Sequence, residues 1–125
     1  MTGVVVVSHG NLGNTFKNEI ENILDHPVRL KTVAVSYRAS VEHTLAVIHE
    51  AIRAAIDGQG VLLLTDLPGA TPHNLACQAA QEQNIPVVSG VNLSMLLKVL
   101  NHCEKPPHDL AGLAARGGRQ GILQV

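Results

Sequence analysis

Residues 3–10 read GVVVVSHG, and this stretch decides the fold. Its consecutive valines form an uncharged apolar run, which is typical of a strand buried on both faces of a parallel sheet. A second such run, VLLLT at residues 61–65, is followed at once by Asp66. If the two runs are neighbouring parallel strands, their carboxyl ends lie at the same edge of the sheet. We therefore expect His9, at the end of the first run, to meet Asp66.

Outside these runs, short apolar segments alternate with segments of helical periodicity. Residues 40–56 show this periodicity, with Ser40 as the N-cap and Gly58 beyond the end. Thr71 and Pro72 predict a helix start in which the threonine hydroxyl caps and the proline is the first helical residue. The alternation predicts an α/β fold, a doubly wound, mainly parallel sheet with helices on both faces. The predicted strands are 3–8, 29–36, 61–65, 86–89 and 121–125, and the predicted helices are 14–25, 40–56, 71–83, 93–104 and 107–116.

The composition indicates a single domain over residues 1–125. Hydrophobic residues make up 46% of the chain and charged residues 15%, which predicts a substantial core and excludes a disordered protein. The apolar runs are far shorter than the roughly 20 residues that span a bilayer, and the chain begins without a leader pattern, so we expect a cytoplasmic protein. A net charge of −1 and an aromatic content of 2% argue against binding to nucleic acid.

The two cysteines and their histidine neighbours predict no metal site. Cys77 and Cys103 lack C-x-x-C spacing, and we expect both to be small buried residues. His102, Cys103 and His108 are close in sequence, but they are interpreted as a polar helix end. No nucleotide-binding or metalloprotease motif is present either. The sequence therefore predicts a site that uses neither a metal nor a cofactor.

The expected contact between His9 and Asp66 limits the chemistry at this edge. An imidazole whose Nδ1–H donates to a carboxylate keeps a free lone pair on Nε2. Such a ring serves as a general base, a metal ligand or a nucleophile that accepts a phosphoryl group. Helices that begin just after both residues would point their N-termini at the same rim, which favours an anion there.

Four neighbouring residues support an anion at this rim. Gly10 and Gly69 allow the backbone to approach closely, and the hydroxyls of Ser8 and Thr71 are expected to donate to phosphate oxygens. The residues by themselves thus favour a histidine that carries phosphoryl groups and an aspartate that orients it. The alternative, a strand-end histidine bonded to a nearby loop, stays open at this point.

Three motifs follow one another in a recognisable order. They are VSHG at residues 7–10, LLTDLPGATPHN at 63–74 and SGVNLSML at 89–96, and a Gly-Arg-x-Gly ending follows at 118–121. This combination resembles the IIA component of the mannose/fructose/sorbose class of the bacterial phosphotransferase system. The resemblance covers nearly the whole chain. It implies a doubly wound α/β domain that forms a homodimer by exchanging its C-terminal strand, for which Gly117 and Gly118 would be a hinge.

The resemblance also implies roles for single residues. His9 would accept a phosphoryl group on Nε2 from the histidine-containing phosphocarrier protein and pass it to a separate IIB component, in sugar uptake that depends on phosphoenolpyruvate. The protein would thus be a phosphotransferase that works as a carrier, peripheral to a membrane permease. Asp66 matches the aspartate that holds the other ring nitrogen, and Thr71 matches a loop hydroxyl. Asn92 is expected to shape the rim of the site.

Two further residues near the site carry expectations of their own. Arg38, just beyond the second strand, would reach phosphate or a partner from the same rim, although a solvated loop arginine is the simpler interpretation. His73, in the first turn of the next helix, is expected to be an ordinary surface histidine. The sequence also departs from the family pattern at Ala70, where a glycine is usual, and at Ser94, where a proline is usual.

Two alternative functions remain open on the sequence. A free-standing IIA protein is also suited to regulation, in which its phosphorylation state controls binding to a target protein. The related phosphocarrier subunit of dihydroxyacetone kinase lacks the Thr-Pro-x-Asn pattern found here at residues 71–74. The sequence names neither the sugar nor the acceptor.

Overall fold

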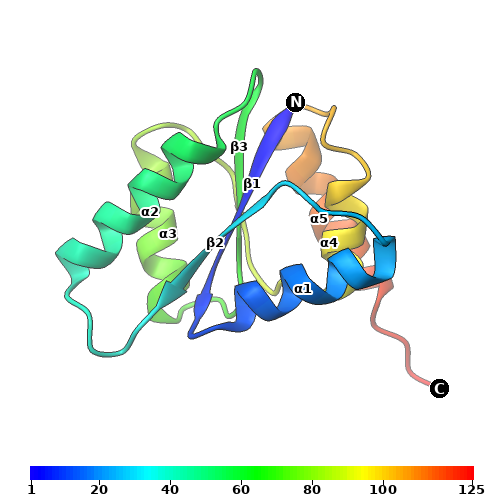
Figure 1. The fold of residues 1–125 in the computed structure, drawn as a ribbon, viewed down its shortest axis with the longest axis horizontal. Coiled ribbons are helices and arrows are strands. Elements are labelled where there is room, and N and C mark those ends of the chain that lie inside the picture. Colours follow the sequence, from blue (N-terminus) through cyan, green and yellow to red (C-terminus); the bar gives the residue numbers. More distant parts are fainter.

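The computed structural model describes residues 1–125 and contains one four-stranded sheet with five helices (Figure 1). The strands lie in the order β2-β1-β3-β4, and every pairing is parallel. The predicted α/β fold class is confirmed. The strands are β1 (Thr2–His9), β2 (Leu30–Val35), β3 (Gly60–Thr65) and β4 (Val87–Val88), and the helices are α1 (Leu12–Leu24), α2 (Val41–Ala55), α3 (Thr71–Gln81), α4 (Leu93–Leu100) and α5 (Pro107–Gln120).

Helices cover both faces of the sheet, as Figure 1 shows. Val4 and Val6 of β1 face a core cluster shared with α1, α4 and α5, and Val5 and Val7 face a second cluster shared with α2 and α3. All four valines are at most 1% exposed. Burial of one such side chain stabilises the fold by about 1.5–3 kcal/mol relative to exposure. The uninterrupted valine run is thus explained by a central strand with a core on each side.

The C-terminal region differs from the prediction. Gly117 and Gly118 lie inside α5 and are buried, so the predicted hinge at these residues is wrong. They allow α5 to lie against α4, since a Cβ at Gly117 would be 2.6 Å from the Lys98 Cβ and one at Gly118 would be 2.9 Å from the Met95 Cε. The helix predicted to end at residue 116 therefore continues to Gln120.

The predicted strand at residues 121–125 does not form within this chain. These residues are exposed and leave the body of the molecule as an extended tail, drawn in red in Figure 1. A strand needs a neighbour for its backbone hydrogen bonds, and nothing in the same chain supplies one here. Exchange of this segment with a second copy stays a prediction.

The close contact between α5 and α4 leads to a prediction about stability. We expect Gly117→Ala to lower the free energy of unfolding by about 1–3 kcal/mol, because the new Cβ overlaps the Lys98 Cβ and the helices must move apart. Urea denaturation followed by circular dichroism measures this change. Gly112→Ala is the matched control in the same helix. There the nearest atom is the Arg116 guanidinium at 3.6 Å. Alanine should be neutral or stabilise by up to about 1 kcal/mol at this position, and equal losses in both variants would contradict the packing argument.

Candidate active site

The site lies where β1 and β3 end. The register pairs Val7 with Thr65, so His9 and Asp66 follow on neighbouring strands at the same edge. The Asp66 Oδ2 atom lies 2.7 Å from the His9 Nδ1 atom, and it also accepts the His9 backbone N–H at 2.8 Å. The Oδ1 atom accepts the Leu67 N–H at 2.9 Å. The predicted contact is therefore present, and the carboxylate is held at both oxygens.

The electrostatics of Asp66 decide which nitrogen of His9 is free. Its side chain is only 11% exposed, and this burial raises its pKa. The hydrogen bonds from the backbone and ring of His9 outweigh burial, and the net pKa lies below the ordinary value of 3.8. Asp66 is thus ionised at neutral pH and can only accept. The proton of a neutral His9 ring must therefore sit on Nδ1, which leaves the lone pair on Nε2.

The lowered pKa of Asp66 predicts how stability responds to acid. A carboxylate with a depressed folded-state pKa stabilises the fold above its unfolded pKa, near 3.8, and this stabilisation is lost as the pH falls through the lower folded value. At pH 7 we expect the free energy of unfolding of Asp66→Asn to be about 1.5–3 kcal/mol lower than that of the wild type, because charged hydrogen bonds are lost. This difference in the free energy of unfolding should shrink as the pH falls below about 4. Urea titrations at a series of pH values measure it, and Glu50→Gln, an exposed carboxylate on α2, should show no such narrowing.

The residues around His9 leave the ring accessible. The His9 side chain is 24% exposed. Gly10 and Gly69 have positive φ values of 47° and 83°, which favour glycine, and an added Cβ at either would contact nothing within 4 Å. A small cavity of about 100 Å³ lies beside His9, and Thr71 and Pro72 form part of its wall. The site is therefore a shallow surface feature and not a deep cleft.

One contact at the site was not predicted from the sequence. The Tyr37 ring centroid lies 5.7 Å from that of His9 with the planes tilted by 38°, and Tyr37 is 88% exposed. Tyr37 belongs to the loop between β2 and α2, whose strand ends beside β1 with Val35 paired to His9. Tyr37 directly follows the predicted strand 29–36, and this position alone was enough to predict an aromatic side chain at the rim of the site.

Two hydroxyl predictions are wrong in their details. Ser8 is fully buried, and its Oγ accepts the Gly13 N–H at 3.0 Å. It therefore anchors the start of α1 and does not face the rim. Thr71 is exposed at the first position of α3, while Ala70 is the N-cap and no side chain caps this helix. The extended backbone at Ala70 puts it in the N-cap position, so the Thr71 hydroxyl is free of any helix-capping bond.

The remaining predicted residues surround the site at different distances from the chemistry. Arg38 is exposed in the same loop as Tyr37, and only its backbone N–H bonds, to the Ser36 Oγ. Asn92 caps α4 by accepting the Met95 N–H at 2.8 Å and also donates to the Gly118 carbonyl at 3.1 Å. Asn92 therefore shapes the fold near the site by joining α4 to α5.

His73 is not the ordinary surface histidine that the sequence suggested. It is half-buried, with its Nδ1 atom 2.7 Å from the Thr65 Oγ1 and its Nε2 atom 3.4 Å from the Cys77 Sγ. Thr65 is fully buried at the end of β3, directly before Asp66. His73 thus ties the first turn of α3 to the strand that positions the carboxylate.

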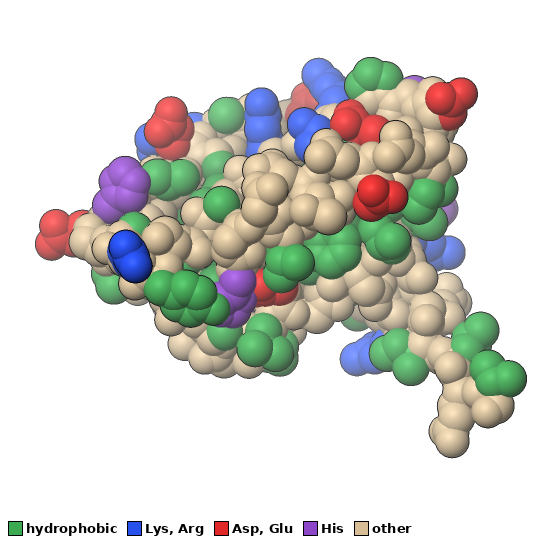
Figure 2. Space-filling view, turned by 60° about the horizontal axis from the view of Figure 1, so that its bottom comes forward, with side chains coloured by type: hydrophobic (Ala, Val, Ile, Leu, Met, Phe, Trp, Pro, Cys, Tyr) green, Lys and Arg blue, Asp and Glu red, His purple; other side chains and the backbone are tan.

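Exposed apolar side chains lie around this end of the molecule. We name as the apolar rim Leu12, Tyr37, Val41 and Leu67, which are between 46% and 88% exposed. Each belongs to a segment that starts at the carboxyl ends of β1, β2 or β3. Figure 2 turns this end towards the reader and shows hydrophobic side chains exposed on it among histidine and acidic side chains. No group of three or more His, Cys, Asp or Glu residues is placed to hold a metal.

Comparisons with known proteins match most of the chain. Residues 3–109 match the family model described as PTS system fructose IIA component. The fructose-specific EIIA component of the PTS of Bacillus subtilis (strain 168) is 28% identical over 102 residues, which cover 81% of this chain and 70% of that protein. None of the helices is long and apolar enough to cross a membrane.

Solved structures show the same fold. The phosphotransferase system component EIIA from Streptococcus agalactiae is 26% identical and superposes with a TM-score of 0.87 over 99% of this chain and 97% of that one. The mannose/sorbose specific IIA subunit from Enterococcus faecalis is 22% identical and gives a TM-score of 0.89 over 99% and 94% of the two chains. The fold of this chain therefore recurs in these two IIA proteins.

Proposed function

This chain belongs to the family of PTS fructose IIA components, which are phosphotransfer proteins, and from that premise we propose that His9 is the residue that carries the phosphoryl group. The observation that carries the proposal is the 2.7 Å contact between the His9 Nδ1 and the Asp66 Oδ2. It leaves Nε2 as the nucleophile on a partly exposed ring. The donor is the phosphorylated histidine phosphocarrier protein, and the acceptor is a IIB component on a separate chain.

The transfer conserves atoms and electrons without a metal or an external base. The lone pair of the His9 Nε2 attacks the phosphorus of the donor phosphohistidine, and the N–P bond of the donor breaks with its electron pair returning to the donor ring. The His9 ring keeps its Nδ1 proton and becomes positively charged. The Asp66 carboxylate, fixed by its hydrogen bonds with His9 and Leu67, stabilises that charge. Reversal of the same step hands the group to the acceptor.

The shape of the site supports transfer between proteins. A partner must bring its own histidine or cysteine against Nε2, and a shallow site permits this approach. The exposed side chains of the apolar rim resemble those at the buried centre of protein–protein interfaces, so a partner can dock on them. The space beside the backbone of Gly10 and Gly69 is open, which leaves room for a partner next to the partly exposed His9 ring. Thr71 shares the small cavity with His9, and Arg38 follows Tyr37 in the loop after β2; both are exposed polar residues that we expect to contact a phosphoryl group held there.

The direct test is phosphorylation with purified components. The protein is incubated with phosphoenolpyruvate, enzyme I and the histidine phosphocarrier protein, and intact mass spectrometry follows the gain of one phosphoryl group. The modification should be labile in acid and stable in base, as expected for phosphohistidine. Addition of the IIB component should then remove the label. A folded sample that gains no label would contradict the proposal.

We also propose that the C-terminal tail joins two copies of this chain. The outer edge of β4 has no neighbour, because the sheet ends there. Ile122 and Leu123 in the tail are 76% and 82% exposed, which is costly for apolar side chains in water. Pairing of the tail with β4 of a second copy would satisfy both the strand edge and these side chains.

The exchange leads to a prediction about the oligomeric state. A chain that ends at Gly121 should be a monomer, whereas the full chain should be a dimer, because the truncation removes the segment that pairs with the partner. Light scattering after size-exclusion chromatography measures both masses. Gln124→Ala is the control, since it keeps Ile122 and Leu123. A truncated chain that still dimerises would contradict the proposed exchange.

A further inference from the structure

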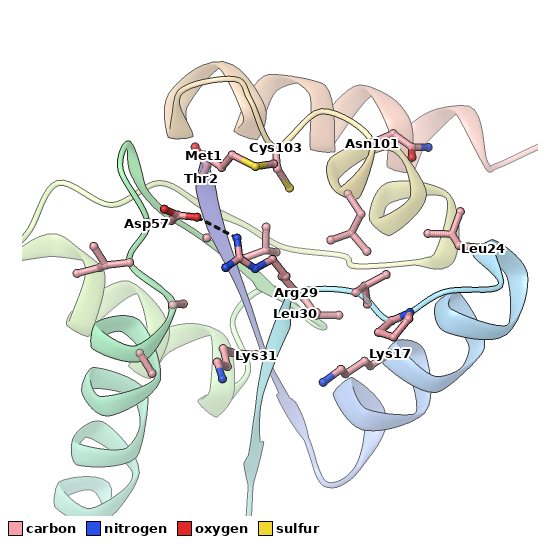
Figure 3. Close-up of a pocket in the computed structure, with 18 of the residues that line it drawn as sticks. Met1, Thr2, Lys17, Leu24, Arg29, Leu30, Lys31, Asp57, Asn101 and Cys103 are labelled. Atoms are coloured by element: carbon pink, nitrogen blue, oxygen red, sulfur yellow. Dashed lines mark hydrogen bonds and ion pairs between the residues drawn. The ribbon is translucent and has the colours of Figure 1, made fainter.

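A second cavity, larger than the one beside His9, lies at the opposite end of the sheet. It has a volume of about 570 Å³ and sits where β1 and β2 begin, beside the segment that joins α1 to β2 (Figure 3). The candidate active site uses none of its residues. Its volume falls in the range of sites for small organic molecules, about 300–1,000 Å³.

The walls of this cavity are largely apolar. Leu24 at the end of α1, Leu30 at the start of β2 and Leu100 at the end of α4 contribute side chains from three separate elements. Cys103 adds a buried thiol, and burial, together with the nearby Glu104 carboxylate, raises its pKa, so this wall is uncharged at neutral pH. In Figure 3, Cys103 and Asn101 line one side and Lys17 and Lys31 the other, with Leu30 between them.

The charged groups around the cavity are mostly positive. Lys17, Arg29 and Lys31 account for three of the nine lysines and arginines in the chain, whereas Asp57 is one of ten acidic residues. His26 also lies on the rim. The whole chain carries a net charge of −1, so this surplus of positive charge is local. It favours an anionic ligand at this end.

The positive side chains around the cavity have weak partners or none within the protein. Arg29 pairs with Asp57 at 3.3 Å, but the two side chains are 87% and 43% exposed, and such pairs are weak. Lys17 and Lys31 have no carboxylate within ion-pair distance, since the two ion pairs of the chain involve other residues. A ligand anion would therefore meet ammonium groups without competing partners.

The helices around the cavity limit the charge of the ligand. α1, α2 and α4 all end here, and the carboxyl ends of helices carry partial negative charge. No helix N-terminus supplies the free N–H groups that bind phosphate dianions elsewhere. A single negative charge balanced by lysine ammonium groups fits this end better than a dianion.

We propose that this cavity is a binding site for an aliphatic carboxylate. The apolar chain would contact Leu24, Leu30 and Leu100, and the carboxylate would lie near the Lys17 and Lys31 ammonium groups. The combination of an apolar interior with a cationic mouth defines the ligand class. A neutral molecule would leave the lysines unused, and a small inorganic anion would leave the apolar walls in water.

Decanoate is the probe for this site. Calorimetric titration of the full-length protein should show one binding site per chain, and amide chemical shifts should change at Leu24, Leu30 and Leu100 and not at His9. Lys17→Gln combined with Lys31→Gln should weaken binding at least about fivefold, because two favourable ion contacts are lost. Decanol, the neutral counterpart, should bind more weakly to the wild type by a similar factor.

The controls separate this site from general attraction of anions. Arg116→Gln combined with Arg119→Gln removes two exposed positive charges on α5, outside the cavity, and should leave decanoate affinity unchanged. Circular dichroism confirms that each variant folds. Equal affinity for decanoate in the lysine variant, equal affinity for decanol, binding of inorganic phosphate as tight as that of decanoate, or no decanoate binding at all would each overturn the proposal.

Discussion

His9→Ala should abolish phosphorylation by the phosphocarrier protein, and intact mass spectrometry should show no labelled species. The substitution removes the nucleophile itself, so no slow residual reaction at this position is possible. The fold should remain, since the His9 backbone N–H still donates to the Asp66 Oδ2 and the side chain contributes no large apolar area to the core. Circular dichroism should therefore show a folded protein, with a lower urea midpoint because the hydrogen bond between the His9 ring and Asp66 is lost.

His43→Ala is the matched control for this variant. His43 is an exposed histidine in the first turn of α2, so its loss tests whether any accessible imidazole accepts the label. It should be phosphorylated at the wild-type level. Label that persists in a folded His9→Ala sample would place the acceptor elsewhere, and His73, bonded to Thr65 next to the site, would be the first residue to examine.

The sequence predicted the reacting pair because strand geometry settles it. Two buried parallel strands place their ends at one edge, and each of these ends carries a polar residue that can be read directly from the chain. The observed contact of 2.7 Å between His9 and Asp66 follows from that register. The same reasoning located Gly10 and Gly69, whose positive φ values agree with their place in the two loops.

Other features depended on packing that the sequence does not display. Ser8 looked like a rim hydroxyl, but strand alternation turns it inward, where its Oγ accepts the Gly13 N–H. Gly117 and Gly118 looked like a hinge, yet close contact with Lys98 and Met95 places them within a helix. Glycine is used in flexible segments and in close helix contacts alike, and only the neighbours distinguish the two.

The sequence could not predict the cavity at the opposite end of the sheet, for a related reason. Its walls come from residues far apart in the chain, for example Lys17, Leu30 and Leu100, and no motif joins them. Tyr37 at the active-site rim is a similar case, since its contact with His9 depends on how the loop after β2 bends. Sequence motifs indicate where strands end, whereas cavities and loop contacts depend on how whole helices and strands pack together.

Asp66→Asn should slow phosphoryl transfer by about 10²-fold or more while the protein remains folded. The substitution keeps the size of the side chain but removes the negative charge that stabilises the phosphorylated ring, and the amide no longer fixes the proton on the His9 Nδ1. This expected fall in rate lies within the range of about 10²–10⁴-fold that oriented acid–base and charge-stabilising groups contribute to catalysis. Rapid-quench measurement of label transfer from the phosphocarrier protein gives the rate.

The rate, rather than the final extent of labelling, carries the argument about Asp66. His9 is still present in Asp66→Asn, so the label should appear in the end, in contrast with its absence in His9→Ala. Glu50→Gln, which removes an exposed carboxylate from α2, should transfer at the wild-type rate. A wild-type rate in Asp66→Asn would mean that the carboxylate only positions the loop after β3. Slow transfer would instead assign the effect to the charge next to the His9 ring, provided that Asp66→Asn and the wild type are equally stable at acid pH. There the wild type has also lost the stabilising contribution of this charge, because the pH has fallen through the lowered pKa of Asp66.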